Sequence, residues 1–224
     1  LVLVLAGCRG GGGRPVASLV PGKDAVSDMT GAGQGQDVLK AAAMLSVEDF
    51  HPGDEVPDES VAVLGADAFF WAEPIDSTVF ARMDGHSYKE GCPVAVGDLR
   101  YLKVLHRDLS GRTLVGEMVV NQSIAGDLLE IFRALYDASY PIERMRLVDD
   151  YDADDEASMQ ANNSSCFNYR RKASINSVSK HALGLAVDIN PLYNPYFRVT
   201  ASGSRIIQPS AAAPYVDRAA QFPY

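Results

Sequence analysis

Residues 179–190 read Ser-Lys-His-Ala-Leu-Gly-Leu-Ala-Val-Asp-Ile-Asn, and the segment contains two side chains of the types that bind zinc, His181 and Asp188. In one continuous helix these two residues would share a face but lie about 10 Å apart along the axis. A metal ion with ligands at about 2 Å cannot bridge that gap. The segment must therefore fold back on itself if both bind one ion, and Gly184 offers the flexible point. Residues 185–189 then predict a short strand in which Asp188 faces the site while its neighbours face a core.

A lone histidine near a lone aspartate is more often a hydrogen-bonded structural pair than a metal site, so the wider pattern has to decide. Short motifs across residues 74–197 supply that pattern. They are Gly85-His86-Ser87-Tyr88, Asp98-Leu99-Arg100-Tyr101-Leu102, Gly116-Glu117-Met118-Val119-Val120-Asn121, Asp154-Asp155, the segment 162–170, Asp188-Ile189-Asn190-Pro191 and Asn194-Pro195-Tyr196. Together with Ser-x-His-x-x-Gly-x-Ala-x-Asp-Ile-Asn, these motifs resemble the M15 peptidases, the family of bacterial cell-wall enzymes that includes D-Ala-D-Ala carboxypeptidases and L-Ala-D-Glu endopeptidases.

The resemblance implies a catalytic zinc ion, which typically takes three protein ligands and a water. His181 and Asp188 match two of the ligands. The family pattern places the third, a histidine, downstream of a Trp-rich stretch, in an acidic-residue-x-x-His element whose acid is the general base. No histidine follows His181 here, and the single tryptophan, Trp71, lies far upstream. We therefore expect a sequence truncated at both ends, and the alternative is a degenerate, non-catalytic relative.

An arginine precedes the zinc motif in the family, where it stabilises the oxyanion, and Arg170 matches it. The surrounding Arg-Arg-Lys differs from the Arg-Ser pairing of some relatives, so Arg171 is an alternative, and a solvated basic turn is the non-functional interpretation. Residues 150–155 read Asp-Tyr-Asp-Ala-Asp-Asp, for which an acidic surface loop is the default. In the M15 interpretation, Asp154 or Asp155 instead steers a nearby arginine.

Three polar residues are expected to support the zinc ligands without binding the ion themselves. Ser179 precedes His181 by two positions, and we expect it to form a hydrogen bond within the site. Asn168 precedes the zinc motif and Asn190 is its last residue, and we expect both to orient the ligands from outside the coordination sphere.

The resemblance also implies a substrate, the peptide stem of peptidoglycan, with hydrolysis of the D-Ala-D-Ala type. Two alternatives stay open: an L-Ala-D-Glu endopeptidase, and a non-catalytic lipoprotein that keeps the fold and binds the cell wall. We expect no nucleic-acid partner, because the net charge is −9 and the lysines and arginines are scattered rather than gathered into a basic stripe.

The beginning of the chain resembles the end of a bacterial lipoprotein signal peptide. An apolar run closes with Leu-Ala-Gly-Cys at Cys8, so we expect residues 1–8 to be a signal remnant and Cys8 to carry a lipid that anchors the protein to the membrane. The protein would then lie in the cell envelope, on the periplasmic or extracellular face. Residues 9–70, rich in glycine and polar residues at their start, predict a mostly flexible linker with a possible short helix at 37–45. Residues 71–224 would form the peptidase domain, with its C-terminal part missing.

Three cysteines fit an exported protein. With Cys8 taken by lipid, Cys92 and Cys166 remain as an even pair in a compartment that permits disulfides. The sequence therefore allows a Cys92–Cys166 bridge. Two buried thiols that behave as small hydrophobic side chains are the alternative.

Hydrophobic patterning predicts the fold class. Asp76 can cap a short helix over residues 77–83, and residues 123–138 carry an apolar stripe at helical spacing. Gly111 suits a hairpin turn between the first two of four predicted strands. The strands are expected at 101–107, 113–121, 142–148 and 185–189. Hairpins favour antiparallel pairing, which predicts an α+β domain with a small antiparallel sheet and flanking helices. The resemblance implies the same fold, which D-Ala-D-Ala peptidases share with the Hedgehog signalling domain.

Overall fold

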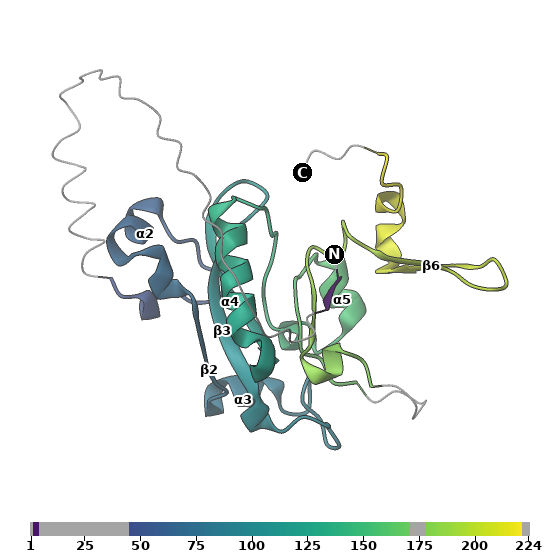
Figure 1. The fold of residues 1–224 in the computed structure, drawn as a ribbon, viewed down its shortest axis with the longest axis horizontal. Coiled ribbons are helices and arrows are strands. Elements are labelled where there is room, and N and C mark those ends of the chain that lie inside the picture. The colour runs from purple at the N-terminus through teal and green to yellow at the C-terminus, as the bar shows by residue number, and fades with distance from the viewer. Residues whose placement is uncertain (1, 5–44, 171–177, 221–224) are drawn as a thin grey trace, which may run out of the picture.

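The computed structural model describes residues 2–4, 45–170 and 178–220, and it confirms the α+β class (Figure 1). A three-stranded antiparallel sheet in the order β2-β3-β4 forms the centre, and two-stranded sheets pair β1 with β5 and β6 with β7. The strands are β1 (Val2–Val4), β2 (Trp71–Pro74), β3 (Leu99–Arg107), β4 (Thr113–Asn121), β5 (Ala186–Asp188), β6 (Tyr196–Val199) and β7 (Arg205–Gln208). The α-helices are α2 (Asp58–Leu64), α3 (Ser77–Met83), α4 (Gln122–Asp137) and α5 (Asp155–Gln160). The 3₁₀ helices are η1 (Val47–Asp49), η2 (Ala66–Phe69), η3 (Val96–Asp98), η4 (Val148–Tyr151), η5 (His181–Leu183) and η6 (Ser210–Tyr215).

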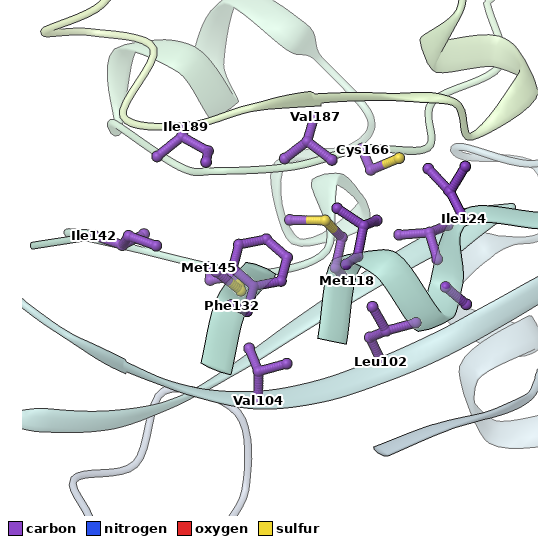
Figure 2. Packing of buried hydrophobic residues seen from close by; sticks show 13 residues of the cluster. Leu102, Val104, Met118, Ile124, Phe132, Ile142, Met145, Cys166, Val187 and Ile189 are labelled. Carbon is purple, nitrogen blue, oxygen red and sulfur yellow. The ribbon is translucent and has the colours of Figure 1, made fainter. Parts of the chain in front are cut away.

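Helix α4 covers one face of the central sheet (Figure 1). Its N-cap is Asn121, whose side-chain oxygen accepts a hydrogen bond from the Ser123 amide at 3.0 Å. The predicted apolar stripe is buried against alternate residues of β3 and β4. The helix residues are Ile124, Leu128 and Phe132, and the strand residues are Leu102, Val104, Met118 and Val120. Figure 2 shows the same cluster continuing to Val187 and Ile189, which flank Asp188. None of the helices in the described part of the chain has the length and apolar character of a membrane span.

The β3–β4 hairpin matches the prediction closely. Its strands pair in a register that places Leu102 opposite Met118, and Gly111 adopts a φ of 86° in the turn. The Asp108 carboxylate closes the turn by accepting hydrogen bonds from two backbone amides, those of Ser110 at 2.8 Å and Arg112 at 2.9 Å. The turn of the hairpin is therefore specified by neighbouring residues.

A buried carboxylate joins separate segments on the other face of the sheet. Glu117 is fully buried, and Arg82 of α3 donates to both of its oxygens at 2.8 and 2.7 Å. The Tyr101 hydroxyl donates at 2.8 Å, and the Arg146 Nε donates at 3.2 Å. Because a buried charge is tolerated only when it is paired and hydrogen-bonded, these partners fix α3 and the segment around Arg146 to the sheet.

Two predictions are wrong: the strand at residues 142–148 and the C-terminal end of the linker. Residues 142–148 form no strand: their buried positions do not alternate, and within the segment only Arg144 makes an isolated bridge, to Asn163. The linker predicted over residues 9–70 is too long at its C-terminal end, because residues 45–70 pack on the sheet through a cluster of buried apolar side chains. These are Phe50, Val56 and Phe69, with Leu105, Val115 and Tyr136. Residues 5–44, including Cys8 and most of the possible helix at 37–45, lie outside the described residues.

The suggested disulfide is also wrong, because Cys92 and Cys166 are both free thiols. Cys166 belongs to the cluster beneath α4, whereas the next residue, Phe167, belongs to a second cluster against which Cys92 packs. Successive side chains of an extended segment point to opposite sides, so the two sulfurs lie in different clusters. Burial raises the pKa of both thiols, in keeping with the alternative of small hydrophobic side chains.

Gly184 ends the 3₁₀ turn η5 and sets the path into β5. It adopts a left-handed conformation with φ 66°, and its carbonyl accepts a hydrogen bond from the Asn121 amide at 2.9 Å. A Cβ at this position would lie 2.7 Å from the Asn121 nitrogen and 3.2 Å from the Val120 carbonyl carbon. Both the backbone conformation and the close approach therefore require glycine.

We predict that Gly184→Ala lowers the free energy of unfolding by at least about 2 kcal/mol, since the left-handed conformation and the backbone clash both penalise a Cβ. The matched control is Gly126→Ala. Gly126 lies in α4 with open space around it, so alanine there should stabilise the helix by about 0.5–1 kcal/mol. Urea unfolding followed by circular dichroism measures both. Equal stability of the two variants would contradict the role of Gly184.

His106 of β3 provides a pH-dependent contribution to stability. The ring is buried, its Nδ1 donates to the Ile142 carbonyl at 2.7 Å, and burial lowers its pKa to about 4. The unfolded chain takes up a proton near pH 6.5, whereas the folded chain does not until the pH approaches 4. The stability contribution is therefore intact above pH 6.5 and is lost as the pH falls through this window.

We predict that acidification from pH 7 to 4.5 costs about 2–3 kcal/mol of unfolding free energy through His106. The variant His106→Gln should lose this component of the pH dependence, whatever its stability at pH 7. His86→Gln should keep it, because His86 is exposed in a turn. Urea titrations at several pH values test this, and parallel pH profiles for the wild type and His106→Gln would refute it.

Candidate metal centre and its cavity

The fold brings His181 and Asp188 side by side. The His181 Nε2 lies 3.4 Å from the Asp188 Oδ2, within the roughly 4 Å that two ligand atoms of one zinc ion can span. The His181 Nδ1 lies 2.8 Å from the Cys166 carbonyl oxygen. Because a carbonyl only accepts, Nδ1 carries the proton and Nε2 keeps its lone pair. This is the tautomer and the backbone hydrogen bond that metal-binding histidines usually show.

The separation of the two side chains agrees with a single zinc ion. Two ligands at about 2.05 Å from a tetrahedral ion lie about 3.3 Å apart, close to the distance between Nε2 and Oδ2. The imidazole and the carboxylate are 20% and 25% exposed, so both remain accessible from the cavity. Strand β5 holds Asp188 in place, because its amide donates to the Ser165 carbonyl at 3.0 Å while the flanking Val187 is fully buried.

The electrostatic environment of Asp188 favours a positively charged ligand. Burial raises the pKa of this carboxyl group, His181 lowers it, and the negative charge of Asp155 raises it again; the net effect is a raised pKa. Arg170 offsets part of the rise. The ionised form is thus disfavoured in the protein alone, and a cation between Asp188 and His181 would stabilise it.

Arg170, Asp155 and Asn168 form a connected group beside the two ligands. Arg170 makes an ion pair with Asp155, and the same carboxylate accepts a hydrogen bond from the Asn168 side-chain amide. Asn168 is buried, donates further to the Ala153 carbonyl at 3.2 Å, and its backbone amide donates to the His181 carbonyl at 3.1 Å. The structure therefore places Asp155 as the residue that positions Arg170, whereas Asp154 caps α5. Arg171 lies outside the described residues.

Ser179 and Asn190 take different places. The Ser179 hydroxyl accepts a hydrogen bond from the His181 amide at 3.3 Å, so it supports the turn that carries the histidine. Asn190 is buried and ties its strand to a neighbouring segment: its oxygen accepts from the Glu143 amide at 3.0 Å, and its nitrogen donates to the Pro141 carbonyl at 2.8 Å. In the described part of the chain, the side-chain hydrogen bonds of Asn190 go to Glu143, Asn162 and Pro141 rather than to His181 or Asp188.

Within residues 45–170 and 178–220, His181 and Asp188 have no third histidine, cysteine or carboxylate close enough to complete a metal-binding group. Asp155, the nearest expected carboxylate, is engaged by Arg170. The described residues thus contain two side chains of the types that bind zinc, and both line the same cavity.

The cavity in front of the two ligands has a volume of about 700 Å³. Most of its other lining residues were not predicted as site residues. They are Ala153, Glu156, Met159, Pro191, Asn194, Tyr196 and Gln208. Tyr196 and Gln208 belong to the β6–β7 hairpin, which projects from the body of the protein (Figure 1). Two short apolar runs separated by Ala-Ser-Gly-Ser are a hairpin pattern. This signal in the sequence could have predicted the hairpin that forms one wall of the cavity.

Comparison with known proteins bears on the segment that carries these features. A family model described as D-alanyl-D-alanine carboxypeptidase, of the M15 peptidases, matches residues 173–222. The match contains His181, Asp188 and the β6–β7 hairpin, and it spans less than half of the chain. No match was found among curated proteins or among solved structures. The match shows that residues 173–222 resemble the M15 peptidases.

Proposed function

We propose that this protein is a zinc-dependent peptidase that hydrolyses the peptide stem of peptidoglycan, with D-Ala-D-Ala carboxypeptidase activity. The observation that carries the proposal is the 3.4 Å separation of the His181 Nε2 and the Asp188 Oδ2 at the base of an open cavity. The His181 ring has the tautomer that leaves Nε2 unprotonated, and burial raises the pKa of the partly exposed Asp188 carboxyl group, so a cation would stabilise its ionised form. The family match covers both residues.

Each neighbouring residue has a role in this proposal. A zinc ion held by His181 and Asp188 would supply Lewis acidity for attack on the scissile carbonyl. Arg170 lines the same cavity and would donate hydrogen bonds to the oxyanion, while its pair with Asp155 fixes the direction of the guanidinium. The Cys166 carbonyl holds the imidazole ring, and Ser179 holds the backbone of the turn. These residues bind and orient; the general base of the reaction is not among them.

The size of the cavity suits a peptide. A volume of about 700 Å³ falls within the range of small-molecule and peptide sites, and the lining combines an aromatic ring with polar side chains. The stem peptide and a location in the cell envelope, through a lipid on Cys8, are parts of the proposal that derive from the sequence resemblance.

We predict that His181→Ala weakens zinc binding by at least about 100-fold and abolishes cleavage of a stem peptide ending in D-Ala-D-Ala, since it removes one of the two ligands. Equilibrium dialysis followed by metal analysis measures the first, and chromatography of the peptide products measures the second. The control is His51→Ala, which removes an exposed histidine from a loop outside the cavity and should change neither.

The outcomes separate the alternatives. Zinc binding and cleavage that both survive His181→Ala would show that His181 is not a ligand. A wild-type protein that binds zinc and stem peptides but cleaves none of them would favour the non-catalytic wall-binding protein. Cleavage at the L-Ala-D-Glu bond instead of the D-Ala-D-Ala bond would leave the proposed metal site intact and would change only the assignment of the bond that is hydrolysed.

We predict that Arg170→Gln lowers kcat for the stem peptide by roughly 100-fold or more, because it removes a charged donor to the oxyanion. Zinc affinity should change little, since Arg170 is not a ligand. The milder variant Asp155→Asn should lower kcat less, because the arginine remains but loses its positioning partner. Steady-state kinetics with the zinc-loaded enzyme measure all three proteins. A kcat unaffected by Arg170→Gln would assign the role to another cation.

A further inference from the structure

The β6–β7 hairpin presents one face to the metal cavity. In its antiparallel register Tyr196 pairs with Gln208, and both side chains line the cavity that contains His181 and Asp188. Residues directly opposite each other in an antiparallel pair project from the same face. The face that carries Tyr196 and Gln208 is therefore the inner face of the hairpin, which continues outward as a wall beyond the mouth of the cavity.

The next inward-facing pair is Arg198 with Ile206. Side chains alternate along a strand, so Arg198 lies on the same face as Tyr196, about 7 Å further from the cavity. Arg205 pairs with Val199 and belongs to the outer face. The hairpin thus carries one arginine on each face, and both arginines are exposed.

Charged side chains that line the cavity have partners within the protein, whereas the Arg198 side chain has none in the described part of the chain. Arg170 is paired with Asp155, and Glu156 accepts hydrogen bonds from the backbone amide and the hydroxyl of Ser210 at 2.7 and 2.6 Å. No ion pair or hydrogen bond within residues 45–170 and 178–220 engages the Arg198 guanidinium. A planar fork of donors at the mouth of a peptide-sized cavity is suited to a carboxylate.

We propose that Arg198 binds a carboxylate of the peptide substrate outside the metal cavity, so that the inner face of the β6–β7 hairpin selects acidic peptides. This inference rests on the proposed peptidase function. The carboxylate recognised by Arg198 lies on the part of the peptide that extends past Tyr196 and Gln208, away from the scissile bond. Binding there is remote from the reacting atoms, so it affects KM more than kcat.

The test uses two peptides that differ at one position, where one carries a carboxylate side chain and the other the corresponding carboxamide. The zinc-loaded wild type should cleave the acidic peptide with a kcat/KM roughly two- to fivefold higher, the range for an exposed charge-assisted contact. Arg198→Gln should reduce this ratio towards one, mainly through KM. Arg205→Gln is the matched control, because it removes the same charge from the outer face, and it should retain the preference.

Salt provides a second readout. The preference of the wild type should shrink between 0.05 and 0.5 M NaCl at about the same kcat, since exposed charges are screened. Two results would overturn the inference: the same ratio in Arg198→Gln as in the wild type, or an equal loss in both arginine variants, which would indicate a general effect of net charge.

Failure of the proposed function gives a different result. If no peptide is cleaved by any of the proteins, fluorescence anisotropy with labelled versions of the two peptides still measures binding. Tighter binding of the acidic peptide that is lost in Arg198→Gln and kept in Arg205→Gln would support the inference for a non-catalytic protein. Equal binding of both peptides to all three proteins would refute it.

Discussion

The close approach of Gly184 to the end of β4 is the constraint on which the candidate site depends. The Gly184 carbonyl is bound by the Asn121 amide, and no space remains for a side chain. This contact fixes the point where the chain reverses between η5 and β5. His181 precedes the reversal and Asp188 follows it, so the separation of their side chains is set by a backbone contact with the central sheet. The sheet thus acts as the rigid platform for the site.

One side of β5 packs in the hydrophobic core, and the other side carries the Asp188 side chain of the candidate site. Val187 and Ile189 enter the cluster beneath α4 with Phe132, as Figure 2 shows, and this leaves Asp188 on the opposite side. Cys166 likewise serves both purposes. Its thiol is buried in this cluster, and its backbone carbonyl accepts the hydrogen bond that holds the His181 ring. A buried apolar residue on each side of a functional one keeps the functional side chain in one orientation, since the core excludes the other register.

Charge distribution around the cavity follows a simple pattern. The inner carboxylates and Arg170 are tied to partners or, for Asp188, face the position where a cation would lie. The outer part of the site is formed by the β6–β7 hairpin, whose inner face exposes Tyr196 and Arg198. Rigid inner groups suit the positioning of reacting atoms, and a projecting two-stranded wall suits recognition of a longer ligand.

Local patterns in the sequence determined the α+β class, the β3–β4 hairpin, helix α4 and the fold-back at Gly184, because period, turn chemistry and capping are properties of neighbouring residues. They failed for residues 142–148, where several partners bury the segment without strand pairing. They also failed for residues 45–70, whose scattered apolar residues gain burial only against the sheet. Only the tertiary structure decided that Asp155 pairs with Arg170 and that the β6–β7 hairpin forms a wall of the cavity. Contacts between residues far apart in sequence depend on how whole elements pack, and no local pattern encodes that.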